Sequence, residues 1–474
     1  MGWNNIDQPE PPPAMTSFLI GAIAAVAIAS YFLSPKVRTA DGFFRGTGDD
    51  GSAPGLLTLT LSQVTTWIFA RSLMNAAILG FYYGIAGALA YAAYYLSFLT
   101  GGMIVDRIRF HHGAASVQEF LTDHYGGMGR WTYNLVVGVR LLSEVFANLL
   151  VIGIIFGAAG TTGYTLAIIG IAVLTLGYSM MGGLRAALRT DVMQTVLLYL
   201  GLVALLTLTV TRPEFDLPAI VGSSPDAGGP GWILLAVALL QIWSYPLHDP
   251  VMMDRGFLAD RATTRKSFLH AAWISIAGIM VFGVIGVYAG LNKGDGEAMV
   301  ATLTRLLGEP AMLVFNLALV VSAVSTLDST FASASKLVAA DMRVMAPSVR
   351  NGRLVMAGFL LGGLGFLFLG NKDLFAAVAV SGTASMFLAP VVLFNVLGGL
   401  RIQAWAYGFA FALAIAGGAL YMLEAGGHVA LIEPLFGLAH KYAKLLLICA
   451  AVLAGGCGAF ALSLAVTGRR RAAV

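Results

Sequence analysis

Charged side chains are scarce in this sequence. Of its 474 residues, 11% are Asp, Glu, Lys or Arg and 58% are hydrophobic, whereas about 25% of the residues in a typical soluble domain are charged. The mean hydropathy is +0.82. So few charges cannot cover the surface of a water-soluble domain of this length, so the composition excludes a soluble protein.

Metal-binding and catalytic motifs are also missing. The two cysteines, Cys449 and Cys457, fall in one apolar run without neighbouring metal ligands, and we interpret both as small core residues. The sequence has no HExxH motif and no GxSxG motif beside polar partners. The net charge is only +4, and the arginines lie in short loops and not along one face, which predicts no nucleic-acid partner. We therefore expect neither an enzyme nor a bound organic cofactor.

Apolar runs of about 20 residues fill the chain instead, each long enough to cross a hydrocarbon layer as a helix. The 57 glycines let such helices pack closely in lipid. We predict an all-α polytopic membrane protein with about 13 transmembrane helices. They are expected near residues 16–34, 56–82, 84–105, 131–158, 163–181, 190–211, 231–253, 268–291, 311–337, 353–370, 374–398, 403–422 and 442–467.

The loops between these runs alternate in charge. One set is rich in Lys and Arg, including Arg185, Arg255 and Lys336, and the other is acidic or mixed. Basic loops face the cytoplasm, which predicts a multi-pass protein of the cell inner membrane, with the N-terminus periplasmic and the tail at 469–471 cytoplasmic. The first residues are acidic and proline-rich, with no basic region and cleavage site, so the first helix is expected to be retained.

Two motifs carry a resemblance. The segment LGYSMMGGLRAALRTDVMQ, residues 176–194, places a Gly-Gly-Leu turn before a Thr-Asp pair, and SAVSTLDSTFASASK, residues 322–336, places hydroxyl side chains around an aspartate. Both resemble the sodium:solute symporter family, and the likeness extends through residues 57–126 and 246–260. The resemblance implies a LeuT-like core of two inverted five-helix repeats, at residues 56–211 and 231–398. Residues 1–55 would form an external N-terminus, one helix and a cytoplasmic loop, and residues 399–474 two further helices and a basic cytoplasmic tail.

Inverted repeats of this kind place their binding sites at the midplane, where broken helices expose backbone groups. Pro246 and Pro250 predict such a break in the second repeat. The first repeat has no central Pro or Gly pair, and the resemblance implies unwinding near Leu61 to Thr65.

The resemblance also implies a sodium site. Sodium needs several oxygen ligands, and the Ser325 and Thr326 hydroxyls with the Ser322 carbonyl would supply three from one helical turn. The carbonyls of Leu61 and Val64 would complete the site. The alternative is that these hydroxyls only bond back to their own helix or join helices, as is common in membranes.

A second sodium site is implied at Asp191, Ser325, Asp328 and Ser329. A carboxylate inside an apolar helix costs about 2.5 to 3.5 kcal/mol on insertion scales, so Asp328 needs water, a cation or a partner. For Asp191 a second interpretation is open: it could cap the N-terminus of the helix predicted to begin at residue 190.

The solute site is expected among polar and aromatic residues placed within the spans. Arg140 and Glu144 are four residues apart, and pairing along one helix face is as good an interpretation as solute binding. Arg71 could hold a carboxylate with two hydrogen bonds, pair with Glu144, or extend its charge towards the membrane surface. The candidate solute-binding residues are Arg71, Asn75, Arg140, Glu144, Trp243, Tyr245 and Asp249.

The resemblance implies sodium-coupled symport of a small polar organic solute into the cell by alternating access. The solute would be an amino acid, urea, a sugar or a carboxylate, and sodium and membrane lipid would be its other partners. Gln63 stands where proline-transporting members carry an acidic residue, which disfavours proline. A proton-coupled transporter and a transporter-like membrane sensor without an output domain are the alternatives.

Overall fold

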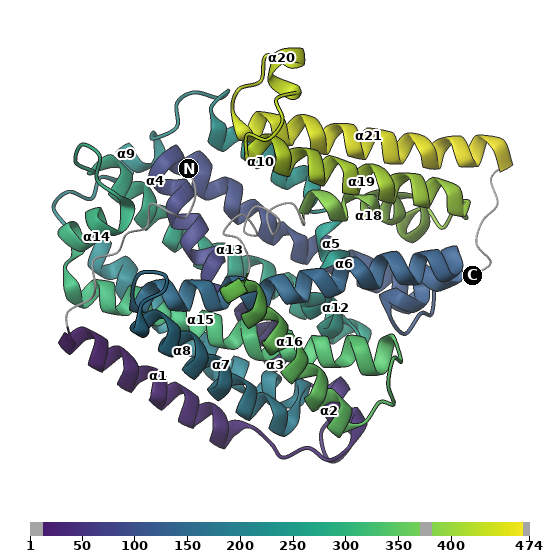
Figure 1. The fold of residues 1–474 in the computed structure, drawn as a ribbon, viewed down its shortest axis with the longest axis horizontal. Coiled ribbons are helices and arrows are strands. Elements are labelled where there is room, and N and C mark those ends of the chain that lie inside the picture. The colour runs from purple at the N-terminus through teal and green to yellow at the C-terminus, as the bar shows by residue number, and fades with distance from the viewer. Residues whose placement is uncertain (1–12, 370–381, 468–474) are drawn as a thin grey trace.

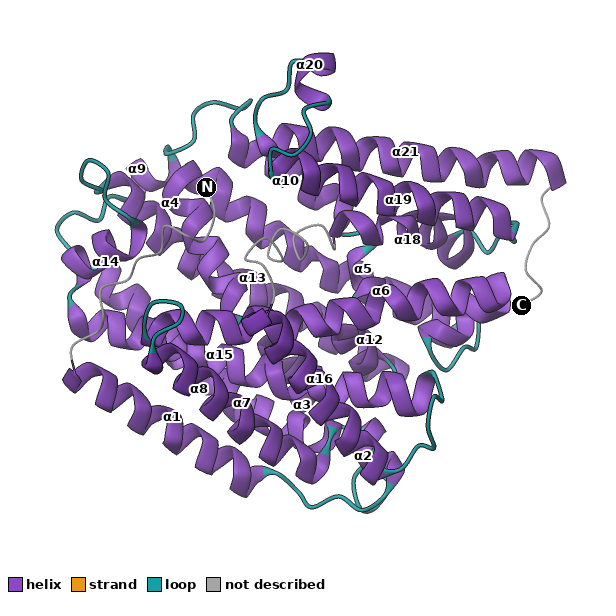
Figure 2. Cartoon of the chain, in the orientation of Figure 1, coloured by secondary structure: helices purple, strands orange, loops and turns teal. Residues whose placement is uncertain are grey.

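The computed structural model describes residues 13–369 and 382–467. Within these two ranges the protein is helical, with turns and loops but no strand (Figure 2). The predicted all-α class is therefore confirmed. The start of the helix expected at 374–398, the first twelve residues and the basic tail at 469–471 lie outside the described residues.

The helices follow in this order. They are α1 (Pro13–Leu33), α2 (Ala40–Arg45), α3 (Leu56–Trp67), α4 (Ala70–Ala93), η2 (Tyr94–Leu96), α5 (Ser97–Phe110), α6 (Val117–Phe156), α7 (Thr162–Gly182), α8 (Leu184–Val210), α9 (Leu217–Val221), α10 (Pro230–Gln241), α11 (Tyr245–His248), α12 (Pro250–Gly256), α13 (Arg261–Leu291), α14 (Met299–Leu307), α15 (Glu309–Lys336), η3 (Leu337–Asp341), α16 (Val349–Leu369), η4 (Ser385–Phe387), α18 (Leu388–Pro390), η5 (Val391–Leu397), α19 (Ala404–Ala425), α20 (Ile432–Phe436) and α21 (Lys441–Thr467).

Ten helical segments among the described residues are long and apolar enough to cross a membrane. The protein is therefore a multi-pass membrane protein. One of the ten, residues 70–110, runs through Gly84, whose φ of 62° and ψ of −152° break the helix. Two further apolar helices, Pro230–Gln241 and Gly382–Leu397, are shorter. The count of 13 spans stays a prediction.

Two predicted helix starts were wrong. The helix expected from residue 131 is part of α6, which begins at Val117 and kinks at Gly126, where φ is 60°. The helix expected from residue 190 is α8, which begins at Leu184 directly after Gly183, where φ is 56°. In both cases the sequence suggested a polar loop, but the glycine absorbs the turn and the polar residues continue the helix.

Two helices are interrupted in the middle of the molecule. The prediction of a break at Pro246 and Pro250 is confirmed, because α10 ends at Gln241 and the short α11 and α12 follow. The unwinding expected near Leu61 to Thr65 was misplaced, since α3 is helical through Trp67 and the chain leaves the helix at Ile68 and Phe69. No Pro or Gly marks that break, so packing must hold it open.

The helices form two groups joined by α8. The first group contains α3, α4, α10 and α13, and the second contains α6, α7, α15 and α16. α8 contacts α3 in the first group and α15 in the second. α1 lies along one side of the molecule and α19 with α21 along the opposite side (Figure 1). The two interrupted helices therefore lie inside the bundle.

Close helix contact depends on glycine where α13 crosses α4. A Cβ atom added at Gly286 would lie 2.0 Å from the Ala77 carbonyl oxygen, and one added at Gly80 would lie 2.3 Å from the Gly283 carbonyl oxygen. Small residues let the two backbones touch, which is how helices associate in lipid without a hydrophobic driving force.

Candidate functional site

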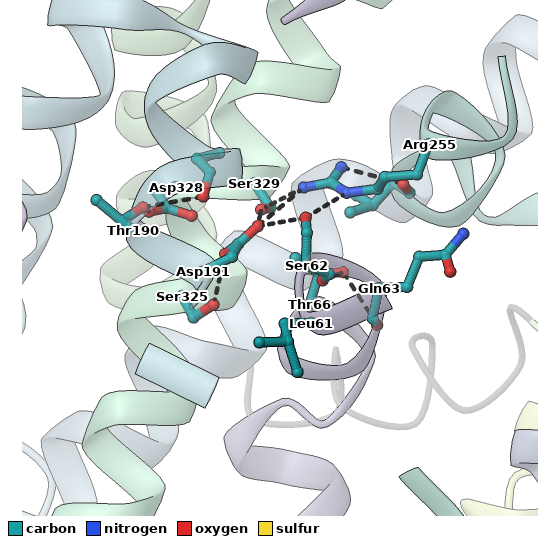
Figure 3. A network of polar contacts seen from close by, with 12 residues as sticks. Leu61, Ser62, Gln63, Thr66, Thr190, Asp191, Arg255, Ser325, Asp328 and Ser329 are labelled. Carbon is teal, nitrogen blue, oxygen red and sulfur yellow. Dashed lines mark hydrogen bonds and ion pairs between the residues drawn. The ribbon is translucent and has the colours of Figure 1, made fainter. Parts of the chain in front are cut away.

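Four helices from distant parts of the chain meet in a buried polar network. The network joins α3, α8, α12 and α15 through Ser62, Asp191, Arg255 and Ser329 (Figure 3). These four side chains are completely buried. Buried polar groups of this kind are stable only when each is hydrogen-bonded, so the network fixes the relative positions of the helices.

Asp191 lies at the centre of this network. Its Oδ2 accepts hydrogen bonds from the Ser62 hydroxyl at 2.5 Å and from Ser329 at 3.4 Å, and its Oδ1 accepts one from the Ser325 hydroxyl at 2.8 Å. Because α8 begins at Leu184, Asp191 is two turns inside the helix. The interpretation of Asp191 as an N-terminal cap was therefore wrong.

Arg255 supplies the positive charge beside Asp191. Its Nη2 lies 3.4 Å from Asp191 Oδ2 and donates to the Ser329 hydroxyl at 2.7 Å, and its Nε donates to Ser62 at 3.0 Å. Arg255 had been assigned to a cytoplasmic loop, and that assignment was wrong. It belongs to α12 and is completely buried, because Asp191 and the two hydroxyls replace the water that its guanidinium would otherwise need.

The set expected to hold a second sodium is divided in the structure. Asp191, Ser325 and Ser329 are brought together, with the Arg255 guanidinium among them. Asp328 instead accepts through its Oδ2 from the Tyr178 hydroxyl at 2.9 Å and from the Thr190 hydroxyl at 2.8 Å. A cation placed among the first three residues would therefore have to compete with a charged side chain that is already present.

Asp328 has one oxygen without a partner. Its Oδ1 is buried and makes no hydrogen bond within the described part of the chain, although the carboxyl group is completely buried. Both donors to Oδ2 are uncharged hydroxyls. A buried carboxyl group with a free oxygen has room for a proton or for a cation ligand.

The oxygens expected to hold the first sodium lie along the facing sides of α3 and α15. The Ser322 hydroxyl donates to the Ile68 carbonyl, and the Thr326 hydroxyl donates to the Ser322 carbonyl at 3.0 Å. The Val64 carbonyl accepts from the Ile68 amide at 2.9 Å, and the Leu61 carbonyl accepts from the Thr195 hydroxyl at 2.9 Å. The Val64 carbonyl and the two hydroxyls keep a further lone pair for a cation, whereas the Leu61 and Ser322 carbonyls also accept amides of their own helices and would have to exchange a partner.

The break at Ile68 and Phe69 places two opposite helix ends next to each other. α3 ends at Trp67 with its carbonyls, which form the negative end of the helix. α4 begins at Ala70, and the amides of its first two residues have no partner within the helix and form its positive end. No side chain caps the start of α4. The carbonyl end is suited to a cation and the amide end to an anion.

Several expected solute-binding residues are brought together beside this break. Arg140 forms ion pairs with Glu144 and, at 3.3 Å, with Asp249. Its Cζ lies 5.9 Å from the Phe69 ring and 5.8 Å from the Tyr245 ring. Arg140 is therefore neutralised by two carboxylates, so the predicted pairing within α6 is confirmed.

Asp249 and Tyr245 belong to the second break. The Asp249 side chain caps α12 by accepting from the Met252 amide at 2.9 Å. The Tyr245 ring lies 5.5 Å from the Trp67 ring and 5.8 Å from the Tyr94 ring. The two interrupted helices thus share one aromatic layer.

The remaining expected residues differ in their surroundings. Arg71 is only 8% exposed and has no ion pair or hydrogen bond with any described residue, and its Cζ lies 5.4 Å from the Phe69 ring. The alternative that Arg71 pairs with Glu144 was wrong, because Arg140 takes that position. Asn75 and Trp243 are half-buried, and neither makes a side-chain hydrogen bond to the described residues.

Sequence reasoning missed Ser62, Thr190, Tyr178 and Arg255. Ser62 follows the expected ligand Leu61, but its side chain points to Asp191 while the expectation concerned backbone carbonyls. Arg255 had one usable signal, because an apolar run at residues 251–253 follows Pro250 and Arg255 lies one helical turn beyond Val251. That spacing indicates a helix and not a loop.

Comparison with known proteins supports the resemblance seen in the sequence. The model of the sodium:solute symporter family matches residues 51–213, a segment that contains α3 to α8. Sodium/glucose cotransporter 4 of Danio rerio is 26% identical over 211 residues, which are 41% of this chain and 31% of that protein. The chain thus matches about a third of the length of this relative. The recognition of the family resemblance is confirmed.

Two solved structures resemble the whole fold. A sodium-coupled sialic acid symporter, in a substrate-bound outward-open state, superposes with a TM-score of 0.75 over 97% of this chain and 99% of that chain, at 16% identity. A nucleobase-cation-symport-1 family transporter, in a closed conformation with bromovinylhydantoin bound, gives a TM-score of 0.54 over 91% and 96% of the two chains, at 14% identity. The predicted LeuT-like fold class is thereby confirmed, and both of these structures belong to transporters.

Proposed function

From the resemblance to the sodium:solute symporter family, we propose that this chain is a secondary active transporter that carries a small polar organic solute into the cell together with sodium. The observation that carries the proposal is the break at Ile68 and Phe69, which sets the carbonyl end of α3 against the hydroxyls of α15. Oxygen groups from two helices that can move apart suit an ion that must be bound and then released.

The coupling sodium is proposed to bind Leu61, Val64, Ser322, Ser325 and Thr326. All five lie on α3 and α15, and Ser322 already joins the two helices. Sodium at this position would link α3 to α15 and so stabilise one arrangement of the two helix groups. Moving one sodium through a potential of about 100 mV releases about 2.3 kcal/mol, which supports a solute gradient on the order of 50-fold.

A second sodium is proposed at Asp191, Ser325, Asp328 and Ser329 only in a state in which Arg255 has moved away. In the present arrangement Arg255 occupies the positive position beside Asp191. Exchange of this guanidinium for a sodium ion would break its contact with α3 and so link ion binding to a movement of α12.

A proton-coupled transporter is the second candidate. It is favoured by the unpaired Oδ1 of the buried Asp328, which could carry a proton between the two sides of the membrane. A transporter-like sensor without an output domain would bind solute with no transport. Uptake measured at fixed pH with and without sodium separates these alternatives.

The solute is proposed to bind between the two breaks, among Arg71, Asn75, Arg140, Glu144, Trp243, Tyr245 and Asp249. Support comes from the aromatic layer that joins Trp67 to Tyr245 and from the ionic group around Arg140.

The inner membrane, with a periplasmic N-terminus and a cytoplasmic C-terminus, remains the proposed location. The proposed core repeats are residues 56–211 and 231–398.

Thermal unfolding of the purified protein with a panel of small solutes tests this function. A ligand that binds only the folded state raises the unfolding temperature as its concentration rises. Sodium-coupled symport predicts a solute whose stabilisation requires sodium and is lost in potassium. Equal stabilisation in both salts, together with uptake that follows a proton gradient, would indicate that protons and not sodium are the coupling ion.

A further inference from the structure

Arg71 is a buried cation without a counter-ion among residues 13–369 and 382–467. It lies in the first turn of α4, is 8% exposed, and its Nε has no hydrogen-bond partner among the described residues. Every other arginine near the break has carboxylate partners: Arg140 pairs with Glu144 and Asp249, and Arg255 with Asp191. Removing a guanidinium from water is costly, and its contact with the Phe69 ring offsets only part of that cost.

Two groups at the break beside Arg71 can only donate, and the neighbouring Tyr91 and Tyr95 hydroxyls donate to the Ser72 hydroxyl and to the Trp67 carbonyl. The start of α4 has no side-chain cap, so its first amides face the same break. The indole Nε1 of Trp67, on the other side of the break, is buried and also unpaired within the described ranges. Guanidinium, indole and the helix amides can only donate hydrogen bonds, so the missing partner is an acceptor, and the buried positive charge favours an anion.

The charges near the break also favour an anion that arrives with a cation. Arg71 and Arg140 carry two positive charges, and Glu144 and Asp249 carry two negative charges, so the group is neutral when empty. A sodium ion at the carbonyl end of α3 adds one positive charge. A carboxylate at the amide end of α4 restores neutrality, so each ligand strengthens the binding of the other.

We propose that the solute is a small organic anion whose carboxylate binds Arg71 beside the N-terminus of α4. The inference rests on the proposed symport function, because it names the class of solute that the same site takes. Arg140 is excluded as the principal carboxylate partner because Glu144 and Asp249 already neutralise it. Its place in the site is to hold Asp249, and through Asp249 the start of α12.

The first test compares acids with their amides. Thermal unfolding of the full chain is followed with propionate, lactate, pyruvate and a set of dicarboxylates, each beside its uncharged amide, in sodium and in potassium. At least one acid should raise the unfolding temperature in sodium, with an apparent affinity at least tenfold above that of its amide. Stabilisation by amides or neutral sugars that equals or exceeds that by acids would overturn the proposal, as would the same stabilisation by chloride alone.

The second test asks whether Arg71 is structural, and it needs no ligand. Arg71→Gln removes a buried charge that pairs with none of the described residues, so the solute-free variant should unfold at the same temperature as the wild type or higher. The acid response should fall at least tenfold in that variant. Arg353→Gln is the matched control, because Arg353 bonds the Met180 carbonyl far from the break. An Arg71→Gln variant that unfolds well below this control would show that Arg71 supports the fold, which would overturn the proposal.

The two salts separate this inference from the proposed function. Acid stabilisation that is equal in sodium and potassium would contradict sodium coupling and leave the anion site intact. Sodium-dependent stabilisation by an uncharged solute alone would support sodium-coupled symport and overturn the proposal that the solute is an organic anion.

Discussion

The Arg255 guanidinium of α12 lies 3.4 Å from the Asp191 carboxylate of α8, and both side chains are completely buried. The same guanidinium reaches α3 through Ser62 and α15 through Ser329. One side chain therefore joins α12 to three other helices, and any movement of α12 away from α8 must separate a buried ion pair.

Truncating this arginine should destabilise the protein strongly. Arg255→Ala leaves the Asp191 carboxylate buried without its cation, a change that costs about 3 to 5 kcal/mol in buried pairs. The unfolding temperature in detergent should fall clearly. The control is Arg261→Ala, which removes an exposed pair with Asp106 and should change it little. Equal unfolding temperatures for the two variants would mean that the Arg255 network does not hold the fold together.

Removing one proposed sodium ligand should weaken the sodium response. Thr326→Ala deletes a hydroxyl on the side of α15 that faces the break, and the loss of about 1 to 2 kcal/mol corresponds to a roughly 5- to 30-fold weaker apparent sodium affinity. Thr330→Ala is the matched control, because Thr330 makes the same bond to its own helix one turn later, at 2.7 Å from the Thr326 carbonyl. The apparent sodium affinity of each variant is measured by following its unfolding temperature as sodium is added. Equal affinities for Thr326→Ala and Thr330→Ala would contradict the proposed sodium site.

The glycine contact between α13 and α4 should not tolerate a methyl group. Gly286→Ala places a Cβ against the Ala77 carbonyl, and overpacking of this kind costs about 1 to 3 kcal/mol. Gly170→Ala on α7 is the control, because no atom lies within 4 Å of its added Cβ. The unfolding temperature of the Gly286 variant should fall while that of the control holds. No difference between them would mean that α13 can shift freely along α4.

The loop after α13 should lose local stability in acid. Arg305 hydrogen bonds lower the pKa of Glu297 from 4.5 to about 2, and the Gly294 amide also donates to this carboxylate. Because the folded pKa is depressed, this stabilisation is complete above about pH 4.5 and disappears as the pH falls towards 2. Hydrogen exchange of residues 292–305 is measured in the wild type and in Glu297→Gln at each pH. The extra protection of the wild type over the variant should shrink as the pH falls from about 4.5 towards 2. A difference that grows on acidification would contradict the assignment.

The sequence predicted most of the helices and one of the two breaks. Long apolar runs specify membrane helices directly, because every backbone group in lipid must be bonded within its own segment. Pro246 and Pro250 predicted the second break for an equally local reason, since proline cannot donate a backbone hydrogen bond. The hydroxyl side chains around Asp328 were likewise visible as a motif.

Tertiary structure decided what the local pattern could not. The break at Ile68 and Phe69 has no Pro or Gly, and the Ser322 hydroxyl, the Tyr95 hydroxyl and the aromatic layer hold its backbone. The residues next to Arg255 in the sequence suggest an exposed loop. The side chain is nevertheless buried, because Asp191, 64 positions away, provides its counter-charge.

The pairing of the central charges was decided in the same way. The sequence left both Arg71 and Arg140 available to Glu144, and the fold pairs Glu144 with Arg140 and gives Arg71 no partner within the described part of the chain. Hydrophobic length and proline act within a few residues of chain, so the sequence alone determined the class of the protein and most of its helices. Ion pairs depend on distances between helices, so only the packed structure decided which of the described charges are paired.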